Sequence, residues 1–408
     1  MIEKYYSGVI EQIYNRIGKE TRNIVMANYS NDFSIENLEV IRRYQSNEDN
    51  VFFAYSEFSY NTLIGAYEPF LDIICNMHRR FIGGSFDDFQ KECGVYYLHR
   101  QVLNSYYETG ECFREETVLL NEVAYERRRM TMAIADMLKR LSEVRPLMIV
   151  INRFQMASKS SIETIKYLID NPCASIGIVL GVNALVKGTD STVEVWDRIV
   201  ESLEDRSAIY YIGSAGSLKN NVKTTNDDEL YITMNFEQSI QEASNIMEFL
   251  DFEQAKRGCR IIEHKLKFED AWIDEKSLRR FYMVYARTSV LLGEMSKAIE
   301  LTNEYKALIP KNDSEHYLSL YYFMKGTCYM YQGKLEKAEN CAKSAYDYAV
   351  LAEDDTLIFK AELLSVMIKM SGWYNIFFCV QDIPVSDEII EKLIKHGYRN
   401  HLAVSYTH

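Results

Sequence analysis

The sequence has 408 residues, of which 47% are apolar and 26% charged, and this length suits two or three soluble globular domains. Its 59 acidic residues outnumber the 46 basic ones, and the formal charge of −13 repels phosphate backbones. We therefore expect no direct binding of DNA or RNA by this segment.

The cysteines, the histidines and the apolar runs exclude several classes of protein. The eight cysteines form no CxxC pair, so we expect reduced thiols in a protein core. The seven histidines form no HExxH or HxH motif, and we expect no metal site. The N-terminus lacks a signal-peptide core, and the apolar runs are far shorter than the ~20 residues of a membrane span. These features predict a cytoplasmic protein that is not inserted in a membrane.

In chain order, the first half alternates short apolar runs with amphipathic segments. Strands are predicted at residues 23–28, 51–55, 147–151, 176–182, 208–212 and 230–234. Helices are predicted at residues 33–45, 67–81, 86–107, 115–141 and 161–169. Continuous apolar strands that alternate with helices are typical of a parallel sheet that is covered on both faces. We therefore predict an α/β domain over residues 1–234.

The second half, from about Phe236 onward, is predicted to be almost entirely helical. One pattern recurs in it: Gly293 to Ala298 matches Gly333 to Ala338, and Gly372 to Phe377 has the same register. A weaker copy runs from Leu250 to Ala255. A period of about 40 residues predicts a helix–turn–helix repeat, with the glycine in the turn and the alanine where two helices touch.

This repeat resembles the tetratricopeptide repeat, with a period longer than the usual ~34 residues of that family. A small residue lies seven positions before each glycine, at Ala286, Gly326 and Ser365. The resemblance implies an α-solenoid of helical hairpins over residues 235–402. A generic helical bundle is the alternative.

A specific family resemblance lies between Tyr125 and Val182. A helix ends before Arg145-Pro146-Leu147, an apolar strand follows, and Ser160 and Ser161 begin the next helical segment. This frame resembles the Walker B region of the STAND class of AAA-like ATPases, as found in large LuxR- and MalT-type bacterial signalling regulators. The resemblance covers about residues 1–235 and implies a P-loop-type parallel sheet. It also implies that strands 23–28 and 147–151 are central neighbours that point at one site.

The residues that would perform the chemistry of this family are missing. A Walker B strand ends in two acids, one that holds Mg²⁺ and one that orients the attacking water. Asn152 and Arg153 occupy those positions here, so one side chain is neutral and the other is a cation. The strand that should carry a sensor residue ends at Asn183, which is also neutral.

The phosphate loop is degenerate as well. A P-loop needs glycines, so that backbone amides can wrap the phosphates, and a lysine that neutralises them. The equivalent positions are Asn28, Tyr29, Ser30, Asn31 and Asp32, which include neither residue type. Little chain is left between residue 234 and the repeats for the usual helical lid and winged helix. We therefore expect a pseudo-ATPase without catalytic residues, cofactor or metal.

The last residues, 403–408, read AVSYTH, which matches one translated frame of a sequencing-library transposon end. We expect a non-native tail on a truncated gene, and a genuine tail is the alternative.

The functional expectation is a signalling or transcription-regulator scaffold whose repeat array binds a protein, a peptide or another effector. The alternative is a weak ATP-binding or ATP-hydrolysing STAND regulator, or the N-terminal part of a diguanylate cyclase.

Overall fold

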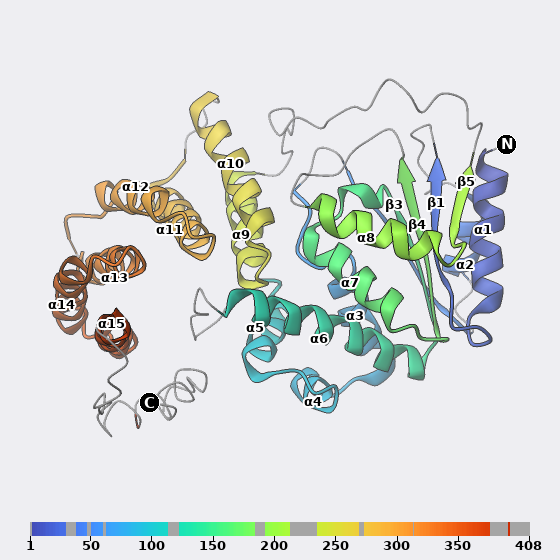
Figure 1. Ribbon diagram of the computed structural model, residues 1–408, viewed down its shortest axis with the longest axis horizontal. Coiled ribbons are helices and arrows are strands. Elements are labelled where there is room, and N and C mark those ends of the chain that lie inside the picture. The colour runs from blue at the N-terminus through green and yellow to red at the C-terminus, as the bar shows by residue number, and fades with distance from the viewer. Residues whose placement is uncertain are drawn as a thin grey trace. The chain divides into compact units, whose positions relative to one another are not determined.

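The fold is taken from a computed structural model (Figure 1). It describes residues 2–29, 38–46, 50–59, 63–112, 122–183, 192–212, 235–268, 273–312, 314–375 and 391. The chain forms two compact units. Unit 1 comprises Met1–Arg114 and Glu122–Phe268, and unit 2 comprises Glu115–Asn121 and Glu269–His408. Unit 1 extends beyond residue 234 and includes the first two helices that follow the α/β part.

Unit 1 contains a five-stranded sheet in the order β2-β3-β4-β1-β5, and every pair in it is parallel. The strands are β1 (Ile24–Tyr29), β2 (Phe52–Glu57), β3 (Leu147–Asn152), β4 (Ile176–Asn183) and β5 (Ile209–Ile212). The predicted parallel sheet is confirmed. The strand predicted at residues 230–234 lies outside the described residues.

The prediction that the first and third strands are neighbours is wrong, because β4 lies between β1 and β3. Both strands are nevertheless interior and point the same way. The apolar pattern could not reveal the order, because β3 and β4 are buried along their whole length and look alike in sequence.

The helices of unit 1 connect these strands and cover the sheet. They are α1 (Ile2–Arg16), α2 (Glu39–Ser46), α3 (Phe70–Met77), the π-helix η1 (His78–Ile82), α4 (Phe86–Glu92), α5 (Tyr97–Thr109), α6 (Val123–Val144), the 3₁₀ turn η2 (Phe154–Met156), α7 (Lys159–Asp170), α8 (Val193–Glu204), α9 (Phe236–Glu248) and α10 (Phe252–Phe268). The chain crosses the sheet one way from β1 to β2 and returns the other way through β3 and β4 to β5. Because such crossovers are right-handed, α2 covers one face and α6, α7 and α8 the other (Figure 1).

The α1 and α2 face has its own apolar core. Tyr6, Ile10 and Ile13 of α1 pack on Val25 and Val179 of the sheet. The two strand glycines, Gly177 and Gly181, let this helix approach closely. A Cβ atom at Gly177 would lie 3.0 Å from Ile13 Cγ2, which is closer than ordinary packing permits.

The α9–α10 hairpin packs on the α/β part of the same unit through buried polar contacts. The fully buried Asp251, in the turn between the two helices, accepts a hydrogen bond of 3.0 Å from the Ser160 backbone N–H. Ser160 lies in the first turn of α7, where a carboxylate satisfies an otherwise unpaired N–H. Glu253 of α10 forms ion pairs with Arg127 at 3.1 Å and with Lys159 at 3.3 Å. The hairpin is therefore an integral part of unit 1.

Unit 2 is helical in its described part. Its helices are α11 (Glu275–Leu291), α12 (Met295–Ala307), α13 (Glu315–Tyr331), α14 (Leu335–Leu351) and α15 (Asp355–Asn375). Gly293 and Gly333 lie in the turns after α11 and α13 with φ of 78° and 71°, as the repeat pattern predicts. Leu250 has φ 68° in the turn between α9 and α10. The prediction of a turn at Gly372 is wrong, because this residue lies inside α15.

The same backbone hydrogen bonds close these turns. After α13, Gly333 N–H donates to the Met330 carbonyl and Lys334 N–H donates to the Tyr329 carbonyl, both at 2.9 Å. This pair of bonds is a Schellman motif, which ends a helix on a left-handed residue. The same bonds occur at Gly293 and Leu250, and also at Glu353, which has φ 52° before α15.

The small residues of the repeat pattern lie where the helices meet. Ala298 and Ala338 are fully buried. A Cβ atom at Gly326 would lie 3.2 Å from Cys341 Cβ and 3.5 Å from the Ala338 carbonyl oxygen. Helices α13 and α14 therefore approach each other closely at this point, as predicted from the sequence.

No helix in the described part of the chain is long and apolar enough to cross a membrane. The cysteines at positions 75, 93, 112, 173, 259, 328 and 341 are free thiols.

Candidate functional site

The sheet topology places a candidate site at the carboxyl ends of β1, β3 and β4. In an open parallel sheet, ligands bind where neighbouring strands send their connections in opposite directions. β1 leads toward β2 and β4 leads toward β5, so this reversal falls between β1 and β4. Their last residues, Tyr29 and Asn183, are register partners there. Asn152, at the end of β3, is held next to them.

The Tyr29 hydroxyl links two of the degenerate motif positions. It donates a hydrogen bond of 2.6 Å to Asn152 Oδ1, between residues that are 123 apart in sequence. Both side chains are buried, and the Tyr6 ring of α1 makes an edge contact with the Tyr29 ring at 6.5 Å. A Cβ atom at Gly181 would lie 2.8 Å from Asn152 Oδ1, so this glycine leaves room for the amide. The only Asn152 side-chain atom that could face a cation thus accepts a protein hydrogen bond.

Arg153, which follows Asn152 after the end of β3, forms an ion pair with Glu57 at the end of β2. The Arg153 Nη1 to Glu57 Oε1 distance is 2.9 Å, and both side chains are mostly buried. Arg153 also donates to the Phe58 carbonyl at 3.3 Å, and the Tyr55 hydroxyl donates to Glu57. The Arg153 backbone has φ 55°, an uncommon conformation for a residue with a side chain. The Glu57 carboxylate is therefore already paired with a cation of the protein itself, Arg153.

The remaining positions are only partly brought together. Asn183 donates its backbone N–H to Gln155 Oε1 at 3.2 Å. The Asn28 side-chain oxygen is buried and has no hydrogen-bond partner among the described residues. Ser30, Asn31 and Asp32 lie outside the described residues.

Two site residues, Tyr6 and Glu57, were not predicted from sequence. Tyr6 belongs to α1, for which no helix was predicted, and Glu57 extends β2 beyond its predicted end. One signal could have pointed to the helix. Gly177 and Gly181 are four residues apart in an otherwise apolar strand, and such glycines indicate close approach by another element on that face.

A second feature of unit 1 is a cavity of about 370 Å³ between α3, α5 and α9. Glu68, Asp72 and Glu242 line it, together with Tyr106, which donates a hydrogen bond of 3.1 Å to Asp72. Burial raises the pKa of Glu242 to about 7, and the negative charges of Glu68 and Asp72 add to the effect. In the described part of the chain, no three His, Cys, Asp or Glu side chains are placed to hold a metal ion.

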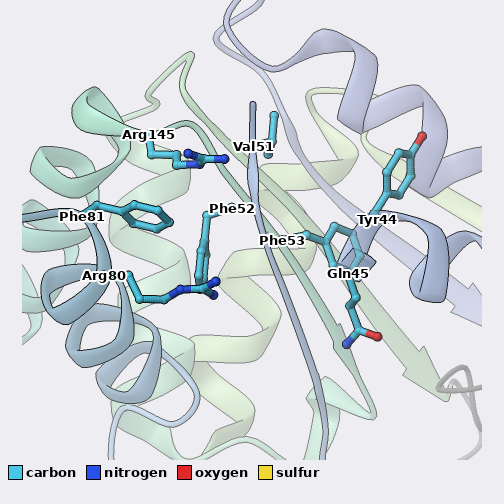
Figure 2. A pocket seen from close by; sticks show the side chains of 8 residues that line it. All are labelled: Tyr44, Gln45, Val51, Phe52, Phe53, Arg80, Phe81 and Arg145. Atoms are coloured by element: carbon cyan, nitrogen blue, oxygen red, sulfur yellow. The ribbon is translucent and has the colours of Figure 1, made fainter. Parts of the chain in front are cut away.

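A third feature is a small pocket of about 80 Å³ at the start of β2 (Figure 2). Arg80 and Phe81 of η1 line it together with Arg145, which precedes β3. Tyr44 and Gln45 of α2 line it as well. Among the described residues that line this pocket, none is acidic.

Comparison with models of known protein families finds no match, and comparisons with curated proteins and with solved structures find none either. The resemblance to STAND proteins therefore stays a prediction from the sequence.

Proposed function

We propose that this chain is a non-catalytic signalling scaffold, in which a nucleotide-binding-type α/β unit no longer processes nucleotide and helical hairpins bind a partner. The observation that carries the proposal is the buried hydrogen bond between Tyr29 and Asn152, at the point where a STAND ATPase would hold its acidic pair. In this bond the Asn152 amide oxygen accepts from the neutral Tyr29 hydroxyl group.

The electrostatics of the site support the same proposal. Mg²⁺ is bound in proteins through carboxylates and phosphates, and it keeps several of its waters. Arg153 adds a positive charge at this end of the sheet, and the Glu57 carboxylate at the end of β2 already pairs with it at 2.9 Å. A cation at Asn152 would therefore be repelled by Arg153 and would have to compete with it for Glu57.

The partner that we propose is a protein or peptide bound by the helical hairpins of unit 2, in the cytoplasm. Tyrosines support this choice, because their rings combine apolar area with a polar tip and are enriched at interfaces. On α14, the Tyr346 side chain is exposed. Tyr322 stacks on Tyr348 of α14, with ring centroids 5.6 Å apart.

Calorimetric titration of the full chain with Mg²⁺-ATP and Mg²⁺-ADP tests the nucleotide half of the proposal. We expect no saturable binding up to about 1 mM nucleotide, which corresponds to roughly −4 kcal/mol. A phosphate-release assay should show no turnover above background.

A matched pair of variants separates true activity from a contaminant. Asn152→Ala removes the vestigial position, and Asn340→Ala changes an exposed asparagine of α14. Turnover that Asn152→Ala abolishes and Asn340→Ala leaves intact would contradict the proposal and favour the alternative, a weak ATP-hydrolysing regulator.

A further inference from the structure

Strand β2 lies at the edge of the sheet, so the backbone groups along one of its edges face away from the other strands. Phe52 N–H donates to the Pro146 carbonyl at 2.8 Å, and Phe58 N–H donates to the Asn152 carbonyl at 3.1 Å. Backbone groups alternate along a strand, so those of Val51 and Phe53 point away from β3. Among the described residues, no strand pairs with β2 on that side. Such an edge can accept an added strand.

In the pocket at the start of β2, Arg145 has no ion-pair partner among the described residues. The Arg145 guanidinium lies over the Phe81 ring, 4.9 Å from its centroid. The Arg145 Nε atom is buried, and it has no hydrogen-bond partner among the described residues. A buried donor on a charged group is costly to leave unpaired, so this atom favours an incoming acceptor.

The size of the pocket restricts what the acceptor can be. Its volume is about 80 Å³, whereas sites for cofactors and drug-sized ligands measure roughly 300–1,000 Å³. It therefore suits a single carboxylate group. Guanidinium and carboxylate also match in geometry, because two parallel N–H groups can meet two oxygens.

The two faces of the sheet differ in chemistry at β2. Figure 2 shows Arg145, Phe81 and Arg80 on one side of the strand, and Tyr44 and Phe53 on the other. The Tyr44 ring lies 5.7 Å from the Phe53 ring, so this second side is aromatic. Side chains of an added strand would alternate between the two sides.

We propose that an extended acidic peptide docks along β2 as an added strand, with one of its carboxylates directed at Arg145 and apolar side chains against Tyr44 and Phe53. The attraction would come from Arg145 itself, because the chain as a whole carries a charge of −13 and would otherwise repel an acidic partner. This surface lies on the α/β unit and is additional to the proposed role of the helical hairpins.

The test is a calorimetric titration of the full chain with a capped peptide of about seven residues that alternates glutamate and valine. We expect saturable binding, and an affinity about tenfold or more lower for Arg145→Gln, because a hydrogen bond to a charged group is lost. Arg140→Gln is the matched control, since Arg140 is exposed on α6 and pairs with Glu143 at 2.6 Å. It should bind as the wild type does.

Two peptide controls test whether the peptide docks as an added strand, without any protein variant. A peptide N-methylated at alternate residues, on the edge that faces β2, loses the strand hydrogen bonds and should not bind. A peptide of the same composition, with glutamates and valines in two separate blocks, should bind more weakly.

The proposal is overturned if the wild-type chain binds no alternating peptide up to about 1 mM, or if Arg145→Gln binds it as tightly as the wild type. It is also overturned if the N-methylated peptide binds equally well, or if free acetate or inorganic phosphate competes as strongly as the peptide. Amide protection at Phe53 on peptide addition, measured by hydrogen exchange, would support it.

Discussion

Glu242 offers the sharpest test of the packing of α9 against the rest of unit 1. Its carboxyl group lines the cavity that contains Glu68 and Asp72, and Gly65 leaves room for it, since a Cβ atom there would lie 2.9 Å from Glu242 Oε1. Burial, followed by the charges of Glu68 and Asp72, raises the pKa of Glu242 from 4.5 to about 7. Glu242→Gln keeps the shape of the side chain and removes the ionisation.

The expected effect follows from proton linkage. Between about pH 4.5 and 7 the folded state keeps a proton that the unfolded state has released, so the free energy of unfolding falls as pH rises through this window. A shift of about 2.5 units at 1.36 kcal/mol per unit amounts to roughly 3 kcal/mol. Above pH 7 the wild type contains an unfavourable buried charge that the variant lacks. Near pH 4.5 the two should be alike.

Hydrogen exchange in urea, followed for peptides of α9 at pH 5 and pH 8, measures this difference within unit 1. Glu237→Gln is the matched control, because it removes an exposed carboxylate from the same helix. At pH 8, Glu242→Gln should raise the free energy of unfolding by roughly 3 kcal/mol, and the control should change it by less than about 0.5 kcal/mol. If Glu242→Gln shows the same pH dependence as the wild type, the proposed burial of this carboxyl group is wrong.

Three further predictions concern unit 2, and thermal unfolding of the full chain checks all of them. Ala338→Trp should lower the stability of unit 2 by about 1–3 kcal/mol, because Ala338 is fully buried where α14 meets α13. Lys337→Trp, at an exposed neighbouring position, should have little effect, and equal effects would refute the assigned register. Gly333→Val should cost about 1–3 kcal/mol, because Gly333 has φ 71°. Glu353→Gly should instead stabilise by about 0.5–1 kcal/mol, since an exposed glutamate there holds φ 52°. The opposite sign at either turn would contradict the Schellman assignment.

The sheet could be predicted from sequence because its strands are mostly apolar and alternate with helices. The strand order could not, since such a run records only that both faces are buried. β4 lies between β1 and β3 because of how segments that are far apart in the sequence are connected, and no local pattern contains that information. The turns at Gly293 and Gly333 were predictable, because a left-handed residue at a helix end selects glycine.

The failures have physical causes as well. Gly372 shares its sequence register with Gly333, yet the local pattern does not decide whether a helix ends there. At the candidate site, the sequence alone showed that neither Asn152 nor Arg153 carries a carboxylate. The contact between Tyr29 and Asn152 was not, because it joins residues 123 apart through the fold alone. The same holds for the pairing of Arg153 with Glu57.

The contact of Asp251 with the start of α7 has a practical consequence for dividing the protein. A chain cut at residue 234, where the α/β pattern ends in sequence, would leave the Ser160 N–H without its buried acceptor and would uncover the Tyr67 ring that packs on Phe249 with a centroid distance of 6.0 Å. Such a fragment would expose apolar surface and invite aggregation. A cut after Phe268 keeps both contacts, because compact unit 1 is longer than the α/β segment by one helical hairpin.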